Sequence, residues 1–209
     1  MNIDKIDYIN KLINDLKVTD FKEEDLDSNS NFLKLKKGYY NLNNGKSIVR
    51  ESVVRCSGNA DAVAIFAITL EMEILLVIQP RVVLPTKNKI SIEVPAGYIE
   101  KDEDVIVAAK RELSEETGYV SDKLFIIDEY YPSLGYSGEK ISIVLAMNCE
   151  KMQEQSLDSD EFVKYFKVNI DEFKYLLDNG FIIDATARLA YYRILEYLSN
   201  NDLLNTIGR

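Results

Sequence analysis

Hydrophobic side chains in the first 58 residues follow two different spacings. In residues 4–17 they recur every three or four positions, which predicts a short amphipathic helix. Residues 18–31 are acidic and rich in Ser and Asn, as is typical of a linker. Residues 32–58 predict two or three short strands around a turn at Asn43-Asn44-Gly45. We therefore expect residues 1–58 to form an accessory region that precedes the main domain.

The middle of the chain is rich in short apolar runs that predict strands. These runs lie at residues 62–68, 74–78, 90–94, 124–130, 141–148 and 162–168. A helix is predicted after Gly97. Asp102 is placed to cap its start, and Asp104 suits the positive end of its dipole. Gly118 stands where the left-handed residue after a helix belongs.

Two further helices are predicted near the end of the chain. One covers residues 171–177 and ends near Gly180, and the other runs from residue 184 to residue 198. The second has an apolar face, made by Ala187, Ala190, Tyr191, Ile194 and Leu198. Together with the strands, these helices predict a main domain over residues 59–209.

The composition is that of a globular protein with an acidic surface. Of the 209 residues, 46% are hydrophobic and 29% are charged, which is ordinary for a folded domain. The formal net charge is -10, and the densest basic stretch is the short one at residues 34–37. A chain of this charge repels nucleic-acid backbones, so polymeric nucleic acid is not an expected partner. A small anionic ligand remains compatible with it, because a divalent metal and a few Arg residues reverse the local field.

The cysteine and histidine contents narrow the chemistry. Two cysteines, Cys56 and Cys149, are too few and too far apart for a disulfide framework or a zinc site, so we expect buried thiols. With no histidine, the chain has no His-based triad and no His general base, which leaves carboxylates, Lys, Tyr or metal-bound water. No apolar run resembles a signal peptide or spans a bilayer, so we expect a cytoplasmic protein without a membrane partner.

The strongest pattern lies between Gly97 and Tyr119. It reads G-x5-E-x7-R-E-U-x-E-E-x-G-U, where U is a bulky apolar residue and the second fixed position is Glu103. At average residue usage such a match arises by chance on the order of 10⁻⁸ times per starting position. The pattern is therefore specific.

The spacing inside this pattern favours a metal site. Glu112, Glu115 and Glu116 are placed i, i+3, i+4, so on a helix they project to one side. Three like charges there destabilise a structural helix, whereas Mg²⁺ prefers carboxylate oxygens and reverses that cost. Arg111 is within reach of Glu103 and of these carboxylates, and is expected to fix their rotamers. The small Ala108 and Ala109 are expected to leave room for a ligand.

Residues 97–119 match the Nudix box, and the chain resembles the Nudix hydrolases over roughly residues 60–198. The resemblance implies an α/β/α sandwich with a mixed sheet. It also implies that Glu112, Glu115 and Glu116 bind Mg²⁺ or Mn²⁺, with the carbonyl of Ala96 as a further ligand. The reaction it implies is attack of water on a phosphorus of a nucleoside diphosphate joined to another group.

Flanking segments resemble the ADP-ribose and nucleotide-sugar pyrophosphatase branch of that family. Glu93-Val94-Pro95-Ala96-Gly97 resembles its E-x-P-A-G, and Gln79-Pro80-Arg81 resembles its Q-x-R, whose Arg contacts substrate phosphate. Arg50-Glu51 resembles a pair that approaches the nucleobase, sometimes across a dimer interface. Asp184-Ala185-Thr186 resembles the branch's C-terminal D-A-x-T. The substrate-binding residues implied are Arg50, Glu51, Arg81, Glu93 and Glu139.

Two acidic residues outside the box compete for the role of catalytic base. Glu161 matches the loop glutamate that this branch uses to activate water or to complete the metal site, and Glu139 is the other candidate. One departure concerns specificity: in Pro132-Ser133-Leu134-Gly135, Leu134 stands where the branch usually has Pro. This departure makes another ADP- or UDP-sugar a stronger alternative to ADP-ribose.

The function expected from the sequence is metal-dependent hydrolysis of a nucleoside diphosphate sugar to a nucleoside monophosphate and a sugar phosphate. The resemblance also implies a homodimer formed through residues 1–58. Two alternatives are a Nudix-fold sensor that binds a nucleotide sugar without turnover, and a Nudix enzyme that acts on nucleoside triphosphates. Sensors typically lose box carboxylates, whereas this chain keeps them all.

Overall fold

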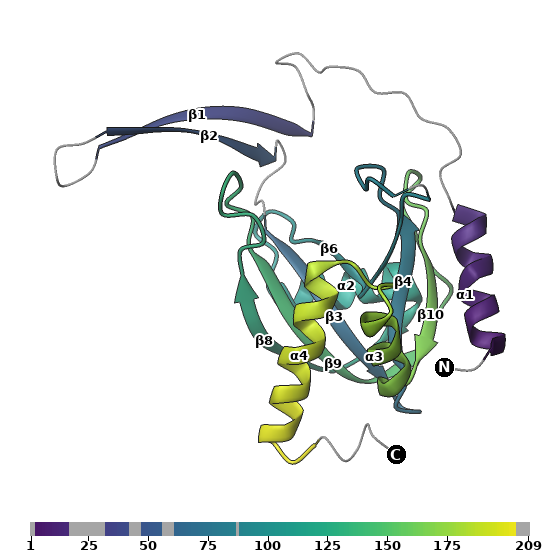
Figure 1. Cartoon of the computed structure of the whole chain (residues 1–209). Coiled ribbons are helices and arrows are strands. Elements are labelled where there is room, and N and C mark those ends of the chain that lie inside the picture. Colours follow the sequence, from purple (N-terminus) through teal and green to yellow (C-terminus); the bar gives the residue numbers. More distant parts are fainter. Residues whose placement is uncertain (1–2, 17–31, 42–46, 56–60, 87, 204–209) are drawn as a thin grey trace.

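The fold is built around one mixed sheet. The computed structural model describes residues 3–16, 32–41, 47–55, 61–86 and 88–203. Helix α2 (Val105–Thr117) covers one face of the sheet, and helices α3 (Ile170–Asp178) and α4 (Ala185–Asn200) cover the other (Figure 1). The protein is therefore an α/β/α sandwich, which confirms the expected fold class.

The strands of this sheet are β3 (Ala62–Thr69), β4 (Ile74–Pro80), β5 (Ile90–Glu93), β6 (Ala96–Tyr98), β7 (Tyr119–Val120), β8 (Lys123–Tyr130), β9 (Ile141–Lys151) and β10 (Lys164–Val168). The main path runs β10, β4, β3, β9, β7, and β5, β6 and β8 pair with β4, β3 and β9. Strands β3 and β9 are parallel, with Ala62 opposite Ile141, and the other pairs are antiparallel. The six predicted strands are confirmed, whereas the short strands β6 and β7 were not predicted.

Strand β3 sends alternate side chains into two cores, which explains its unbroken apolar run. Val63, Ile65 and Ala67 pack on the α2 side, with Leu113 of that helix. The even-numbered side chains pack on the α3 and α4 side. Ala108 and Ala109 are fully buried in the α2-side core, so the expectation that they leave room for a ligand is wrong. Their small size instead brings helix α2 close to the sheet.

Both ends of helix α2 are fixed by local chemistry. Its N-cap is Asp104, whose side chain accepts a hydrogen bond from the backbone N–H of Ile106 at 2.8 Å. Asp102 has a positive φ of 64° and lies in the preceding turn, so the prediction that it caps the helix is wrong. Gly118 ends the helix with a φ of 73°, as predicted. Helix α4 is capped by Asp184, and the five apolar residues predicted on its inner face are all buried.

The N-terminal part adds a helix and a hairpin. Helix α1 (Ile3–Leu16) confirms the first predicted helix, and it buries Ile9 and Leu12 in the core that contains α3 and α4. Strands β1 (Leu33–Asn41) and β2 (Ser47–Arg55) pair antiparallel and stand off to one side of the main sheet (Figure 1). The predicted linker, the turn at Asn43-Asn44-Gly45 and Cys56 lie outside the described residues. Within the described part of the chain, no helix is long and apolar enough to cross a membrane.

Candidate active site

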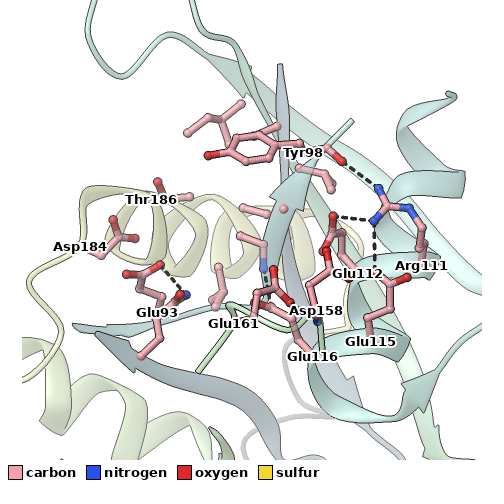
Figure 2. A pocket seen from close by; sticks show the side chains of 18 of the residues that line it. Glu93, Tyr98, Arg111, Glu112, Glu115, Glu116, Asp158, Glu161, Asp184 and Thr186 are labelled. Atoms are coloured by element: carbon pink, nitrogen blue, oxygen red, sulfur yellow. Dashed lines mark hydrogen bonds and ion pairs between the residues drawn. The ribbon is translucent and has the colours of Figure 1, made fainter. Parts of the chain in front are cut away.

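A cavity of about 550 Å³ opens at the end of the sheet where β5, β6 and the start of α4 meet helix α2. Its walls carry the box glutamates on one side, and Glu93, Asp184 and Thr186 on the other (Figure 2). A volume in this range is typical of small-molecule sites. The sequence-predicted residues that line it are Glu112, Glu115, Glu116, Arg111, Glu161, Ala96, Arg81, Glu93 and Glu139.

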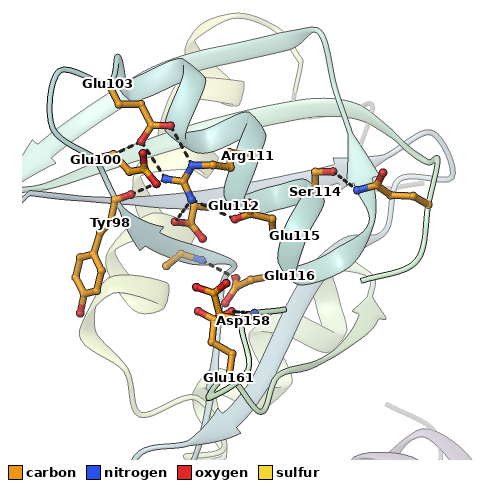
Figure 3. Close-up of polar contacts among 12 residues, drawn as sticks. Tyr98, Glu100, Glu103, Arg111, Glu112, Ser114, Glu115, Glu116, Asp158 and Glu161 are labelled. Carbon is orange, nitrogen blue, oxygen red and sulfur yellow. Dashed lines mark hydrogen bonds and ion pairs between the residues drawn. The ribbon is translucent and has the colours of Figure 1, made fainter. Parts of the chain in front are cut away.

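Arg111 donates hydrogen bonds to several glutamates of the box. Its Nε and Nη2 donate to the two carboxylate oxygens of Glu103 at 3.0 and 2.9 Å, and Nη1 donates to Glu112 at 2.7 Å and Glu115 at 3.1 Å (Figure 3). Nη2 also donates to the carbonyl of Tyr98 at 2.8 Å. The hydrogen bonds to Glu103 raise the pKa of Arg111, and the same contacts lower the pKa of Glu103. Arg111 thus contacts the residues that the sequence predicted it to reach.

Glu112 reaches the cavity because residue 97 has no side chain. A Cβ on Gly97 would lie 2.0 Å from the carboxylate carbon of Glu112. Only glycine therefore lets this carboxylate lie against strand β6. Burial raises the pKa of Glu112, and the hydrogen bond from Arg111 opposes that shift.

Glu116 is the most deeply buried of the box carboxylates, with 3% of its surface exposed. Its Oε2 accepts a hydrogen bond from the backbone N–H of Ala96 at 2.9 Å. Burial raises its pKa well above the usual range, and the negative charges of Glu112, Glu161 and Glu93 add to the rise. A buried carboxylate surrounded by like charges is a poor structural choice, so this arrangement points to a cation.

The donor set fits a hard divalent cation in its chemistry. Glu112, Glu115 and Glu116 supply only carboxylate oxygens, and the sequence provides no competing His ligand. As placed, the acidic side chains in the described ranges form no group of three that converges on one metal position. The reason lies in their present partners, since Arg111 lies between Glu112 and Glu115 and the Ala96 N–H holds Glu116.

Glu161 lies on the loop between β9 and β10 and faces the box glutamates (Figure 2). It is exposed, and its Oε2 accepts a hydrogen bond from the backbone N–H of Asp158 at 3.2 Å. Asp158 also lines the cavity, and the sequence did not single it out. Glu161 therefore lies at the end of the cavity that carries Glu112 and Glu116 (Figure 3).

Glu93 and Arg81 form a bidentate ion pair on the opposite wall. Nε and Nη2 of Arg81 donate to the two oxygens of Glu93 at 2.8 and 2.6 Å. The hydrogen bonds that this guanidinium donates to Glu93 raise the pKa of Arg81. The side chain of Arg81 is 45% exposed, so it still presents charge to a ligand while Glu93 holds it in place.

The N-terminus of helix α4 closes this wall. Asp184 accepts a hydrogen bond from the backbone N–H of Ala187 at 2.7 Å, and Thr186 accepts one from the hydroxyl of Tyr130 at 2.6 Å. Burial raises the pKa of Asp184, and the negative charge of Glu93 adds to the rise. Asp184 and Thr186 therefore line the cavity at the start of the helix.

Arg55 is a cavity residue that the sequence did not reveal. Its guanidinium carbon lies 3.8 Å from the ring centre of Tyr98 and 5.0 Å from that of Phe32, and its Nη2 donates to Glu139 at 2.7 Å. Its Nη1 is buried and has no hydrogen-bond partner within the described residues. A half-buried guanidinium on a cavity wall is suited to an anionic ligand.

Two predicted substrate-binding residues, Arg50 and Glu51, lie outside this cavity, as does Leu134. Arg50 and Glu51 are exposed on strand β2, opposite Gly38 and Lys37, and do not line it within this protomer. Leu134 is exposed in the turn after β8 and does not line it either. Glu139 lines the cavity but is paired with Arg55, which favours Glu161 over Glu139 as the candidate base.

The site has the features of a Nudix hydrolase: glutamates on one helix, a glycine packed against one of them and an arginine that contacts them. The family model of the NUDIX domain matches residues 58–188, and the chain belongs to this family. It is 37% identical over 164 residues to the "ADP-ribose pyrophosphatase" of Bacillus subtilis, covering 78% of this chain and 83% of that protein. It is also 36% identical over 162 residues to the "Methanol dehydrogenase activator" of Bacillus methanolicus, covering 76% and 84%.

A solved structure supports the fold. The crystal structure of an "ADP compounds hydrolase" superimposes with a TM-score of 0.71 and covers 86% of this chain and 93% of that one. At 21% identity this likeness concerns the fold. The sequence relatives, rather than the structural neighbour, therefore guide the choice of substrate.

Proposed function

We propose that this protein is a Nudix pyrophosphatase that hydrolyses ADP-ribose or a related nucleoside diphosphate sugar. The observation that carries the proposal is the cavity with box glutamates on one side and the guanidiniums of Arg55 and Arg81 on its other walls. Hydrolysis of a diphosphate needs both kinds of group. The guanidiniums bind the negatively charged phosphates, and the carboxylates would hold a metal ion. The names of the relatives support ADP-ribose as the first substrate to test.

The proposed reaction is attack of a water oxygen on one phosphorus, with cleavage of the bond from that phosphorus to the bridging oxygen. Glu161 accepts the proton of the water, and the departing phosphate takes the bonding electrons. The products are a nucleoside monophosphate and a sugar phosphate. Arg55 and Arg81 hold the diphosphate, and Arg111 keeps the carboxylates of Glu112 and Glu115 in place.

Glu112, Glu115 and Glu116 would hold Mg²⁺ or Mn²⁺, with the carbonyl of Ala96 as a further ligand. When bound, the cation supplies charge neutralisation for the diphosphate and acidifies water. Arg111 uses only Oε1 of Glu112 and Oε2 of Glu115, which leaves the other oxygen of each carboxylate to face the cation. The fork of Arg111 on Glu103 remains in that case, so the arginine keeps its place.

A substrate panel tests the proposal. The full chain is incubated with ADP-ribose, ADP-glucose, UDP-glucose, dinucleoside polyphosphates and nucleoside triphosphates, each with Mg²⁺ or Mn²⁺ and with EDTA as the control. We expect AMP and ribose phosphate from ADP-ribose with metal only. Tight binding without products would identify a sensor, and preference for a triphosphate would identify the other rival activity.

Arg55 offers a second test of the same proposal. Arg55→Gln removes the positive charge but keeps a hydrogen-bonding side chain. We expect a higher KM for the diphosphate substrate with a smaller change in kcat, because the phosphate contact is made in the ground state as well. Unchanged KM would remove Arg55 from the proposed site.

We also propose a homodimer formed through the β1–β2 hairpin, in the cytoplasm where nucleotide sugars are metabolised. One face of this hairpin carries Leu35 and Tyr39, which are 73% and 74% exposed, with Val49 opposite Tyr39. A two-stranded hairpin with an exposed apolar face is marginal by itself, and a second copy of the chain would cover it. A dimer would also give Arg50 and Glu51 the partner's cavity to reach.

The double substitution Leu35→Lys with Tyr39→Lys tests the dimer by sedimentation velocity. We expect a shift to monomer, whereas Lys34→Ser with Lys36→Ser on the other face of β1 should leave the mass unchanged. A monomeric wild-type chain would contradict the dimer.

A further inference from the structure

The loop that carries Glu161 is fastened to the C-terminal turn of helix α2. We define the Glu161 loop as residues 152–163, between strands β9 and β10. The last carbonyls of any helix lack partners inside the helix and must find them elsewhere. In this protein they find them in the Glu161 loop and in the residue before it. Figure 3 shows a further contact, in which the loop donates a hydrogen bond to the side-chain hydroxyl of Ser114.

Backbone N–H groups make the first part of this attachment. Ser156 donates to the carbonyl of Glu115 at 2.9 Å, and Met152 and Gln153 donate to the carbonyl of Gly118 at 3.0 and 3.2 Å. Lys151 adds its ammonium, which donates to the carbonyl of Thr117 at 2.9 Å. The loop therefore begins against the same helical turn that bears two of the proposed metal ligands.

The remaining helix carbonyl, that of Glu116, accepts its hydrogen bond from the side chain of Gln155. Its Nε2 donates to the carbonyl of Glu116 and to the carbonyl of Val163, the latter at 3.3 Å. Val163 is buried and ends the loop. One half-buried amide thus joins the backbone of Glu116 to the far end of the Glu161 loop.

The tip of the loop is held by its own hydrogen bonds. Glu161 donates its backbone N–H to the carbonyl of Asp158 at 3.0 Å, and its carboxylate accepts from the N–H of Asp158 at 3.2 Å. These contacts shape the tip but do not fix its distance from helix α2. That distance is set where the loop meets the helix. Gln155 is the residue whose side chain contacts both the helix, at Glu116, and the far end of the loop, at Val163.

We infer that Gln155 is a positioning residue that holds the carboxylate of Glu161 at its working distance from Glu116. This inference rests on the proposed function, in which Glu161 accepts a proton at the metal-bearing end of the cavity. Both partners of Gln155 are carbonyl oxygens, so the contact requires an N–H donor. A carboxylate of the same shape offers only acceptors and pushes the two carbonyls apart.

Gln155→Glu tests the inference, and Gln153→Glu is its matched control. Gln153 lies in the same loop and donates to the hydroxyl of Ser114 at 2.8 Å, and a hydroxyl can turn to donate to a carboxylate instead. We expect Gln155→Glu to lower kcat by about tenfold to 100-fold with KM nearly unchanged, because small misplacements of a reacting group have effects of that size. Gln153→Glu should keep near-normal kcat.

A double-variant cycle separates positioning from a merely structural role. If Gln155 acts through Glu161, Gln155→Glu causes no further loss of kcat in a Glu161→Gln background. Independent losses in the cycle, or normal kcat in Gln155→Glu alone, would overturn the inference. If Gln155→Glu unfolds the chain, Gln155→Met, which is similar in length but has no donor, takes its place in the cycle.

The same cycle distinguishes failure of the inference from failure of the proposed function. A large loss in Glu161→Gln together with normal activity in Gln155→Glu removes only the positioning role. Full activity in Glu161→Gln overturns the assignment of the base, and the inference with it. Absence of turnover in the wild-type chain on every substrate of the panel overturns the proposed function itself.

Discussion

The Cα atom of Gly97 and the carboxylate of Glu112 lie so close that a methyl group on residue 97 would be 2.0 Å from the carboxylate carbon. The contact lies between strand β6 and helix α2, where both residues line the cavity. The first fixed residue of the sequence pattern is thereby explained by a packing requirement. Any side chain at residue 97 displaces one of the proposed metal ligands.

Gly97→Ala is therefore expected to lower kcat/KM by about 100-fold or more, because the added methyl group moves Glu112 away from the cavity. Steady-state kinetics with ADP-ribose and Mg²⁺ measure the effect. Gly135→Ala is the matched control, since a Cβ at Gly135 meets no atom within 4 Å. Equal activity in the two variants would mean that Glu112 is not needed where the structure places it.

Glu116→Gln separates chemistry from folding. The amide oxygen of the new side chain can accept the hydrogen bond from the Ala96 N–H, while the negative charge is lost. We expect turnover to fall by about 100-fold or more, since one charged ligand is removed from the site. The melting temperature should stay the same or rise, because burying a charge opposes folding.

Circular dichroism and thermal unfolding check the fold of that variant. A large fall in melting temperature would show that Glu116 is mainly a structural residue. Near-normal turnover would remove the glutamate face of helix α2 from the proposed metal site.

Asp184 provides a prediction about pH. Its pKa is raised above the ordinary 3.8, mainly by burial, so its protonated form is favoured in the folded chain. Its contribution to the free energy of unfolding is fully present below pH 3.8. This contribution is lost as the pH rises through the pKa of Asp184 in the folded chain. Asn is an equally good N-cap and carries no charge, so Asp184→Asn keeps the start of helix α4.

Urea unfolding of the wild type and Asp184→Asn should therefore diverge as the pH rises from about 4 to about 8, with the variant more stable at the upper end. The difference should shrink toward the acidic end, where both side chains are neutral. A variant that is less stable at every pH would mean that the charge of Asp184 stabilises the helix end more than burial opposes it.

Cys149 is expected to be an inert thiol. It is 1% exposed, and burial raises its pKa to about 12. In a Cys56→Ser background, reaction with a disulfide reagent at neutral pH should be slower than in urea by about 100-fold or more, because the thiolate is the reactive form. Fast reaction in the native state would show that strand β9 opens readily.

The sequence predicts this fold well where apolar side chains recur at the period of a helix or a strand. Six strands and four helices follow from the spacing of apolar side chains, and the fork of Arg111 on Glu103 follows from the box. Strands β6 and β7 were missed because three and two residues are too short to show a period. The sequence does not separate Asp102 from Asp104 as the helix cap, because the two side chains have the same chemistry and only the backbone conformation distinguishes them.

The position of Arg55 in the cavity depends on contacts between distant segments, which no local sequence pattern predicts. It reaches the cavity because strand β2 meets the turn after β8, where the N–H of Val53 donates to the carbonyl of Tyr136 at 2.8 Å. Tyr98 then comes from strand β6 to lie under the guanidinium. Three segments far apart in the sequence make this part of the site, so only the folded chain reveals it.

The parallel pairing of β3 with β9 also governs when a site can exist during synthesis of the chain. Strand β3 leaves the ribosome early, but its neighbour opposite Ala62 is Ile141, which is made much later. Contacts between such distant segments form slowly, and until then the apolar strand β3 lacks its central partner. A nascent chain that has just completed helix α2 therefore carries Glu112, Glu115 and Glu116 before the cavity that they line can form.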